Sequence, residues 1–524
     1  MIKEQYTKLN LEKSKESVSR GAERTIVREH PRTYKDDVAN FSNSASIKEI
    51  FRAYDIRGNS LTDLTPQIAY KIGFCFAKMS ITNDNTKICV GIDGRLSSPT
   101  LYKALEKGLT DAGSEVINLG VVPTPVLYFA DKQFTPSGSI MVTGSHNPKD
   151  DNGFKLVQNG KPFFGEQIQE LLANIDVIQW SNQPSLRGAV SDVAIQKNNK
   201  QDWIPWRGHG MTLHENNIQS QYLKRILEEI TINPKLKIAW DCGNGATGDV
   251  IEELKNHLSN ENIIINSKID GNFPSHHPDP TKLANLQELI KVVKEQNCDF
   301  GIAFDGDGDR LGIVSSNGKM LFGDQILCIF AEDILKDNPN ATIIVDVKAS
   351  QLIVDKIKSY GGQAIIWRTG HPFIKSKMSE TKALLAGEMS GHIFFADKYY
   401  GFDDAIYAAL RFLDLLSRLD KTLDEIIENL PKSYNTPEVK IFVPTELKLR
   451  VIQEVKERLR EEKIIFNDID GVRVNTENGW WLLRSSNTES AIIARAESAS
   501  NEGLEKIITI INKYLEKYGL LISY

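Results

Sequence analysis

Three segments of this 524-residue chain repeat one pattern, and the repeat constrains the fold more than any other feature. Each opens with an apolar strand that ends on aspartate, continues with a helix and a second strand, and ends with a third strand that leads into a polar, glycine-containing loop. The opening strands are Lys87–Asp93, Lys237–Asp241 and Thr342–Asp346, the helices lie near 100–112, 247–258 and 350–360, and the second strands are Glu115–Leu119, Asn262–Asn266 and Gln363–Trp367. Strands that alternate with helices predict a largely parallel sheet with both faces covered.

The polar loops that follow the third strands are the expected functional sites, because ligands of such sheets gather at the carboxyl ends of the strands. These loops are Thr143–Pro148, Asp305–Arg310 and Gly387–His392. After about residue 432 the pattern changes to a predicted helix at Lys448–Glu461, two strands at Gly479–Arg484 and Ala491–Arg495, and a last helix near 501–517. The predicted fold class is α/β, with three similar domains of mixed, mostly parallel sheets and a smaller C-terminal α+β domain around one central cleft.

The same patterns place the domain boundaries. Residues 1–46 are rich in Lys, Glu, Arg and Ser without clear periodicity, which predicts a mostly disordered extension with at most one short helix. Domain I is expected at 47–195, domain II at 196–320, domain III at 321–432 and domain IV at 433–524. The polar stretch 197–217, which carries Trp203 and Trp206, is interpreted as an insertion in domain II.

The loop Asp305–Arg310 reads Asp-Gly-Asp-Gly-Asp-Arg, with carboxylates at alternate positions. At ~6 Å spacing and an effective dielectric of ~20, each like-charge pair costs roughly 3 kcal/mol, and Arg310 offsets only part of that. A solvated acidic turn is the simpler interpretation. However, the apolar runs 300–304 and 311–314 flank the loop and predict buried strands. A hard divalent cation would relieve the repulsion, so Asp305, Asp307 and Asp309 are predicted metal ligands.

The loop after the strand Gly138–Thr143 contains Ser145, with His146 beside it and Lys155 downstream. There is no G-x-S-x-G elbow, so acyl transfer is not favoured. A hydroxyl near a metal and cations suits phosphoryl transfer, in which catalysis is mostly positioning and charge neutralisation.

Two further loops carry polar side chains suited to a phosphosugar. In the third domain Glu388 and Ser390 alternate between glycines, which suits hydrogen bonding to adjacent sugar hydroxyls, and His392 can shuttle a proton. In the C-terminal domain the run Arg484-Ser-Ser-Asn-Thr488 offers a guanidinium, hydroxyls and an amide, with Arg495 across the expected hairpin. An ordinary turn is the alternative there, but guanidinium groups match phosphate oxygens bidentately.

The composition indicates which classes of protein can be excluded and in which cellular compartment the protein is expected. Hydrophobic content of 41% and charged content of 25% are ordinary for a globular protein, and a net charge of -6 argues against a nucleic-acid binder. The five scattered cysteines include no C-x-x-C pair, which suits a reducing compartment. No apolar run of about 18 residues is present, and residues 1–6 resemble no signal peptide. We therefore expect a cytoplasmic protein with no membrane partner.

Taken together, these motifs resemble the α-D-phosphohexomutase superfamily, and most closely its bacterial phosphomannomutase/phosphoglucomutase branch. The similarity covers roughly residues 48–520 and includes Phe51-Arg-Ala-Tyr-Asp-Ile-Arg-Gly58, Gly94-Arg-Leu-Ser-Ser-Pro99 and Asn152-Gly-Phe-Lys155 besides the four loops. The resemblance implies that Ser145 is a phosphoserine and that Mg²⁺, one per chain, is bound by Asp305, Asp307, Asp309 and an oxygen on Ser145, with His146 and Arg310 close by.

The resemblance also implies the roles of the remaining residues. Substrate would be bound by Tyr54, Lys348, His371, Glu388, Ser390, Arg484, Ser485, Ser486, Asn487, Thr488 and Arg495. The catalytic proton handlers would be among Arg57, Lys155 and His392, which the sequence does not rank. The implied reaction interconverts hexose 6-phosphate and hexose 1-phosphate, with mannose and glucose as sugars. It proceeds through a 1,6-bisphosphate of glucose or mannose that also acts as activator.

Alternative functions remain open at this stage. Met389 within Gly-Glu-Met-Ser-Gly-His favours the mannose/glucose branch over a phosphoglucosamine mutase, which typically has glutamine at that position. A non-catalytic phosphosugar-binding scaffold and a Mg²⁺-dependent phosphatase are the other candidates. The expected partners are small phosphosugars, and a monomer or a dimer is expected.

Overall fold

The computed structural model describes residues 44–178, 180, 215–228, 230–233, 235–487 and 489–523. The predicted extension at 1–46 and the insertion at 197–217 lie almost wholly outside these ranges. Residues Ser46–Tyr524 form one compact unit. Among the described residues, no helix is both long and apolar enough to cross a membrane.

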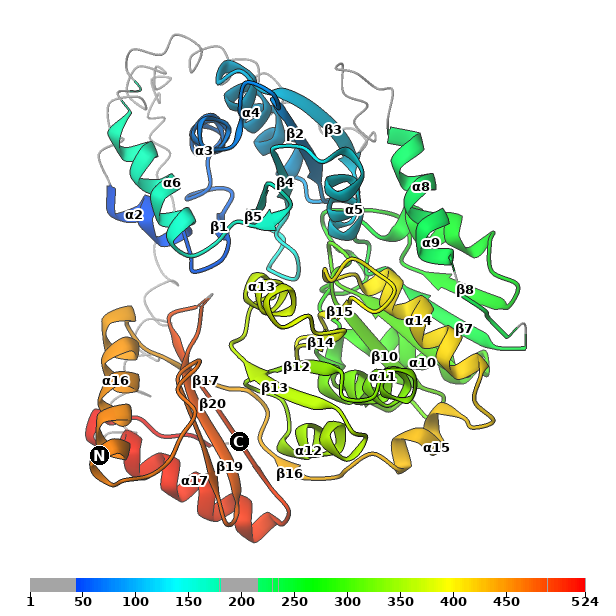
Figure 1. Ribbon diagram of the computed structural model, residues 1–524, viewed down its shortest axis with the longest axis vertical. Coiled ribbons are helices and arrows are strands. Elements are labelled where there is room, and N and C mark those ends of the chain that lie inside the picture. The colour runs from blue at the N-terminus through cyan, green and yellow to red at the C-terminus, as the bar shows by residue number, and fades with distance from the viewer. Residues whose placement is uncertain are drawn as a thin grey trace, which may run out of the picture. The chain divides into compact units, whose positions relative to one another are not determined.

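The first sheet has the strand order β1-β5-β4-β2-β3. Its core is parallel, with β2 between β3 and β4, whereas β5 runs antiparallel to β4. Helices α3 and α4 lie side by side on this sheet (Figure 1). The elements are α2 Ser44–Ile50, β1 Ile56–Asn59, α3 Pro66–Ser80, β2 Lys87–Ile92, α4 Ser98–Asp111, β3 Glu115–Val121, α5 Thr124–Phe134, β4 Gly138–Val142, β5 Asp151–Gln158, β6 Lys161–Pro162 and α6 Glu166–Val177.

The second sheet repeats this topology with the order β11-β10-β9-β7-β8. Strand β7 lies parallel between β8 and β9, and β10 returns antiparallel to β9. Its elements are α8 Glu215–Leu227, β7 Lys237–Asp241, α9 Gly248–Lys255, β8 Glu261–Ile265, the 3₁₀ turn η3 Leu283–Leu286, α10 Gln287–Glu295, β9 Phe300–Phe304, β10 Leu311–Ser315 and β11 Met320–Leu321.

The third sheet, β13-β12-β14-β15, is the shortest version of the same arrangement. Strand β12 pairs in parallel with β13 and β14, and β15 returns antiparallel to β14. Its elements are α11 Gly323–Asp337, β12 Thr342–Asp346, α12 Gln351–Ser359, β13 Gln363–Trp367, α13 His371–Thr381, β14 Leu385–Gly387, β15 Ile393–Phe395, α14 Ala405–Ser417 and α15 Leu423–Glu428. The threefold repeat expected from the sequence is therefore present as a repeated sheet topology.

The fourth sheet is antiparallel, with order β16-β20-β19-β18 and β17 paired to β20. One face is covered by α16 and α17, whose apolar residues pack against Trp481 and Leu483 (Figure 1). The elements are β16 Tyr434–Asn435, β17 Val439–Phe442, α16 Thr445–Glu461, β18 Val472–Thr476, β19 Gly479–Ser485, β20 Ala491–Ser498, α17 Asn501–Leu515 and η4 Glu516–Tyr518. The expected strands and helices of this C-terminal module are all found.

The repeated topology places the expected functional loops at equivalent positions. In each of the first three sheets the loop joins the third parallel strand to the antiparallel strand that follows it. These hairpins are β4–β5, β9–β10 and β14–β15. A single hydrophobic cluster includes residues of all three sheets, such as Cys89, Trp240 and Val345. The three sheets that carry these hairpins therefore contribute to one hydrophobic core.

Candidate active site

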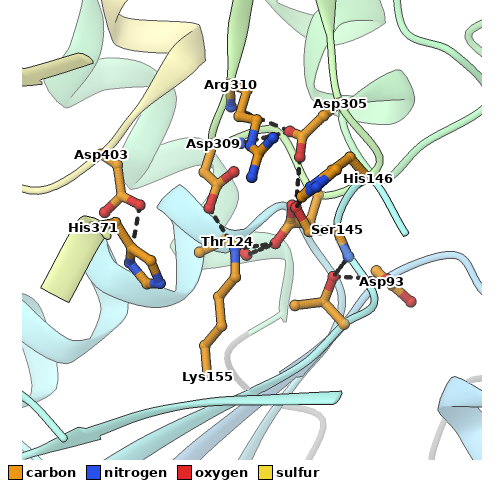
Figure 2. Close-up of polar contacts among 12 residues, drawn as sticks. Asp93, Thr124, Ser145, His146, Lys155, Asp305, Asp309, Arg310, His371 and Asp403 are labelled. Atoms are coloured by element: carbon orange, nitrogen blue, oxygen red, sulfur yellow. Dashed lines mark hydrogen bonds and ion pairs between the residues drawn. The ribbon is translucent and has the colours of Figure 1, made fainter. Parts of the chain in front are cut away.

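Ser145 lies in the β4–β5 loop with 1% of its surface exposed. Its backbone adopts φ +49°, in the left-handed region that non-glycine residues rarely occupy. The backbone N–H of Ser145 donates to Thr143 Oγ1 at 2.8 Å. The hydroxyl donates to Asp305 Oδ2 at 2.7 Å and lies 3.2 Å from His146 Nδ1 (Figure 2). The loop therefore aims the serine hydroxyl at the acidic loop of the next sheet.

Asp305, Asp307 and Asp309 are each fully buried in the β9–β10 turn. Asp305 Oδ1 accepts the backbone N–H groups of Asp309 and Arg310, which curls the loop around this carboxylate. One oxygen from each aspartate lies within 4.8 Å of the others. The loop is thus a buried cluster of three carboxylates and not the solvated turn that was the simpler alternative.

The charge of this cluster is offset mainly by Lys155, which the sequence predicted as a catalytic residue but not as the counter-ion of the acidic loop. Lys155 Nζ lies 2.6 Å from Asp307 Oδ2 and forms a second ion pair with Asp309 Oδ2. Thr124 Oγ1 also donates to Asp307 Oδ2 at 2.5 Å. Arg310, expected to offset only part of the repulsion, is one of several cations near the cluster.

These contacts shift the pKa values of Asp305 and Asp309 in opposite directions. Burial and the charges of Asp307 and Asp309 raise the pKa of Asp305 well above its ordinary value. Burial also acts to raise the pKa of Asp309, but Lys155 and His392 outweigh it and hold that pKa well below normal. A cation at this loop would favour the ionised form of all three groups.

The residues fit a hard divalent cation. Among the described residues, Asp307 Oδ1 is buried without a hydrogen-bond partner, and the polar neighbour of Asp309 Oδ1 is His392 Nε2 at 3.3 Å. Buried carboxylate oxygens without partners are costly unless a ligand satisfies them, and such oxygens are the ligands that Mg²⁺ and Ca²⁺ prefer. The donors predicted from the sequence, Ser145 and the three aspartates, therefore lie together.

The β14–β15 loop reaches the same cluster through His392. Its Nε2 lies 3.3 Å from Asp309 Oδ1, and its Nδ1 lies 2.8 Å from Glu388 Oε2 and 3.2 Å from Ser390 Oγ. Burial lowers the pKa of His392, but the two carboxylates prevail and raise it to about 9. Glu388 also accepts the backbone N–H of Gly370 at 2.6 Å.

Arg57 is fixed beside the serine loop. Its Nε donates to Asp55 Oδ2 at 2.5 Å, and its Nη1 donates to Gly144 O at 2.7 Å. Despite burial, the Asp55 carboxylate raises the pKa of Arg57 above that of a free guanidinium. Arg57 is therefore a fixed positive charge at this site.

Tyr54 and His371 lie together, with ring centroids 5.8 Å apart. His371 Nδ1 is 3.2 Å from Asp403 Oδ2 (Figure 2). Lys375 Nζ donates to Asp403 Oδ1 at 2.8 Å. Burial and the Lys375 charge lower the pKa of His371 to about 4. Asp403 and Lys375 were missed in the sequence, because an aspartate before a helix is usually only a cap and a helical lysine is usually solvated.

The expected phosphate loop lies between β19 and β20. Arg484 Nε donates to Asp470 Oδ2 at 2.9 Å, and Arg495 Nη1 donates to the carbonyl of Lys348 at 2.5 Å. Both arginines are 4% exposed, and among the described residues Arg484 Nη2 and Arg495 Nε have no hydrogen-bond partner. Buried guanidinium donors left unpaired are suited to an anion.

The rest of this loop is only partly described. Ser486 is buried, Ser485 and Asn487 are half-buried, and Thr488 lies outside the described residues. Asn487 Nδ2 donates to Thr369 O at 3.4 Å, which links the loop to the third sheet. Lys348 Nζ lies 2.6 Å from Glu438, an acidic residue that the sequence did not single out. Among the described residues no hydrogen bond joins this loop to Ser145 or to the three aspartates.

Four family models, described as phosphoglucomutase/phosphomannomutase domains, match the chain in order. Domain I matches residues 48–181, domain II 220–318, domain III 322–434 and the C-terminal domain 438–513. A phosphomannomutase/phosphoglucomutase of Pseudomonas syringae pv. tomato is 42% identical over 468 residues, which are 89% of this chain and 95% of the relative.

Solved structures show the same similarity. A phosphoglucomutase/phosphomannomutase family protein from Burkholderia thailandensis has a TM-score of 0.76 and 36% identity, over 90% of this chain and 98% of that one. An N-acetylphosphoglucosamine mutase from Aspergillus fumigatus, solved with GlcNAc-6P and magnesium, shares the fold with a TM-score of 0.53 and 15% identity, over 91% of this chain and 97% of that one. The chain belongs to the phosphoglucomutase/phosphomannomutase family of hexose phosphate mutases.

Proposed function

We propose that this protein interconverts hexose 6-phosphates and hexose 1-phosphates through a phosphorylated Ser145. The single observation that carries this proposal is the 2.7 Å hydrogen bond from Ser145 Oγ to Asp305 Oδ2. It joins a serine on one sheet to a buried acidic loop on another. A structural serine has no need of three buried carboxylates beside it, whereas phosphoryl transfer needs both a carrier oxygen and neutralisation of the phosphoryl charge.

The proposed reaction is two phosphoryl transfers in opposite directions. In the first, the free hydroxyl of the sugar phosphate attacks the phosphorus on Ser145, the P–O bond to Ser145 breaks, and a hexose 1,6-bisphosphate forms. The bisphosphate then turns around, and Ser145 Oγ attacks its other phosphorus. That step restores the phosphoserine and releases the isomeric monophosphate. Each attacking hydroxyl loses a proton, and each leaving oxygen gains one.

Proton transfer is assigned to Arg57, Lys155 or His392. Arg57 and Lys155 each lie against carboxylates that raise their pKa, so both are positive charges in this arrangement. His392 has a pKa of about 9 and contacts Asp309 and Glu388, so it can donate a proton to a leaving oxygen. His392 is therefore the first residue to test as the proton donor.

We further propose that Asp305, Asp307, Asp309 and an oxygen on Ser145 hold one Mg²⁺ per chain. A bound Mg²⁺ would supply Lewis-acid neutralisation of the charge on the transferring phosphoryl group. Glu388 and Ser390 would accept hydrogen bonds from adjacent sugar hydroxyls. Arg484, Ser485, Ser486, Asn487, Thr488 and Arg495 would bind the phosphate that does not react, with Tyr54, Lys348 and His371 completing the substrate site.

Mannose and glucose phosphates are the proposed substrates, with glucose or mannose 1,6-bisphosphate as activator. The comparison of kcat/KM for mannose, glucose and glucosamine 1-phosphates tests this assignment. If kcat/KM were highest for glucosamine 1-phosphate, the protein would instead be assigned to the phosphoglucosamine mutases.

The decisive experiment is intact-protein mass spectrometry after incubation with Mg²⁺ and glucose 1,6-bisphosphate. We expect one added phosphate, located on Ser145 by peptide mapping, and none in Ser145→Ala. Ser359→Ala, which changes a serine at the end of α12, is the matched control and should be labelled like the wild type. A protein that is never labelled and never turns over would support the scaffold alternative. Net release of inorganic phosphate would instead indicate a phosphatase.

A further inference from the structure

Arg95 is a completely buried arginine beside the serine loop that no step of the proposed reaction uses. Its side chain has no exposed surface. Every N–H of its guanidinium group has an acceptor within the protein. Nη1 donates to Pro148 O at 2.5 Å and Asp151 O at 2.9 Å, Nη2 donates to Ser145 O and Asn147 O at 2.7 Å each, and Nε donates to Asp93 Oδ2 at 3.2 Å.

This hydrogen-bond pattern argues against phosphate binding, the role usually expected of an arginine near a phosphoserine. A guanidinium that binds a phosphate must direct free N–H donors toward it. Those of Arg95 are occupied by four backbone carbonyls and one carboxylate, whereas Arg484 and Arg495 keep unpaired nitrogens. Arg95 therefore acts on the loop itself and not on the substrate.

The carboxylate of Asp93 also binds the Ser145 loop, at its first residues. Its Oδ2 accepts Thr143 Oγ1 at 2.8 Å and the backbone N–H of Gly144 at 3.1 Å. Thr143 Oγ1 in turn accepts the N–H of Ser145. The buried pair of Asp93 and Arg95 thus satisfies N–H groups at the start of the loop and carbonyls along the rest of it.

The loop needs such support because its backbone is unfavourable. A left-handed conformation at a non-glycine residue costs on the order of 1 kcal/mol, and Ser145 has φ +49°. The carbonyls of Ser145 and Asn147 point inward, where only a hydrogen-bond donor makes their burial acceptable. Gly144 lies directly on the guanidinium, since a Cβ at this position would overlap Arg95 Cζ.

Arg95 also lies where the first and second sheets meet. The ring of Phe273 is 5.3 Å from Arg95 Cζ, and a Cβ on Gly271 would come within 2.6 Å of Gly94 O. On the same side, a Cβ on Gly306 would come within 2.5 Å of Ser145 O, so the acidic loop also rests on the serine loop. Arg95 is therefore packed between the loop that carries Ser145 and the segment of domain II that faces it.

We propose that Arg95 is a positioning residue: its guanidinium holds the Ser145 loop in the left-handed turn that aims Oγ at Asp305. The proposal rests on the proposed function, because the quantity it controls is phosphoryl transfer through Ser145. Loss of the clamp lets Oγ move by about 1 Å, and a displacement of that size typically lowers the rate by about 100-fold. Substrate binding changes little, because Arg95 has no donor for the substrate.

The test compares Arg95→Ala and Arg95→Lys with the wild type in two assays. The first is the rate of Ser145 labelling by glucose 1,6-bisphosphate, followed by intact mass, and the second is steady-state turnover of mannose and glucose 1-phosphates. For Arg95→Ala we expect kcat and the labelling rate to fall by about 100-fold with KM changed by less than about 3-fold. Added guanidinium ion, at tens of millimolar, should restore part of the lost rate.

Arg411→Ala is the matched control. Arg411 is also a buried arginine, paired with Asp397 through two hydrogen bonds and lying over the ring of Phe395. Within the part of the chain that the structure describes, no hydrogen bond or ion pair joins Arg411 to the loops around Ser145. Its removal should lower Tm while kcat per folded molecule stays within about 3-fold of the wild type, and guanidinium ion should have no effect. A general loss of stability would affect both variants alike.

Arg95→Lys covers the case in which the alanine variant does not fold. An ammonium keeps the charge opposite Asp93 but cannot reach the separate carbonyls of the loop, so a folded lysine variant should show the same loss of kcat with near-normal KM. Wild-type kcat in either folded variant, or a rise in KM without loss of kcat, would overturn the proposal. If the wild-type protein itself were neither labelled nor active, the proposed function would fail instead.

Discussion

Replacing Lys155 by methionine tests whether this lysine is the counter-ion of the acidic loop. Its ammonium lies 2.6 Å from Asp307 Oδ2, contacts Asp309 as well, and is 4% exposed. At an effective dielectric of ~20, the attraction to each carboxylate is ~4 kcal/mol, and desolvation of the charges offsets much of it. Loss of one partner from a buried ionic cluster typically costs about 3–5 kcal/mol.

We therefore expect Lys155→Met to lose about 3–5 kcal/mol of stability in EDTA, which corresponds to a fall in Tm of roughly 3–5 °C for a unit of this size. Methionine keeps most of the volume of the side chain, so the loss reports charge and not a cavity. Because a divalent cation brings positive charge to the same carboxylates, adding Mg²⁺ should raise the Tm of the variant more than that of the wild type.

Differential scanning calorimetry at several Mg²⁺ concentrations measures both effects. Lys375→Met is the matched control, because Lys375 is a buried lysine whose ion pair is with Asp403; among the described residues it forms no ion pair with the three aspartates of the acidic loop. Its Tm should also fall, but its response to Mg²⁺ should equal that of the wild type. If Lys155→Met responded to Mg²⁺ no more strongly than the wild type and the control, the assignment of Lys155 as counter-ion to the metal loop would be wrong.

Three further outcomes are expected. Ser145→Ala should abolish turnover while sugar-phosphate affinity, measured by calorimetry, stays within about 3-fold of the wild type. Arg484→Ala should raise KM at least about 10-fold with a smaller effect on kcat, because a charge-assisted contact to the phosphate that does not react contributes about 1.5–3 kcal/mol; an unchanged KM would remove Arg484 from the cradle. Burial acts to lower the pKa of His276, but Asp241, 2.8 Å from its Nε2, raises it above 6.5. This stabilisation is present below pH 6.5 and is lost as the pH rises through the folded pKa, so the Tm difference between wild type and His276→Asn should shrink in alkaline buffer.

Several elements could be read directly from the sequence. The strands Lys237–Asp241, Thr342–Asp346 and Gln363–Trp367 have the expected bounds, because uninterrupted apolar runs between polar boundaries are a strong local signal. The helix ends predicted from the sequence agree less well with the structure than the strand ends do. The helix expected at 247–258 ends at Lys255, and the one expected at Lys448 begins at Thr445, directly after Pro444. Helix ends depend on single caps and on packing, which a periodic pattern does not encode.

The residues of the site were predicted from the sequence less completely than the elements of the fold. Glycine-spaced carboxylates and a serine in a tight loop are recognisable from a few neighbouring residues, so the sequence could single out Ser145 and the three aspartates, which the structure brings together. The sequence did not single out Thr124, which donates to Asp307, nor Asp403 and Lys375 beside His371, nor Glu438, which pairs with Lys348. These are single residues on ordinary helices, turns and strand ends. Nothing in their immediate sequence distinguishes them from the many solvated or capping residues of the same types.

The order of strands, helices and polar loops was determined by the sequence itself, because periodicity, glycine and side-chain charge act over a few neighbouring residues. Tertiary structure alone decided that Lys155 neutralises Asp307 and Asp309, and that Arg95 holds the carbonyls of the loop around Ser145. Those contacts join residues that are dozens to more than a hundred positions apart, so they form only when the sheets pack on their shared core and water leaves the charges between them.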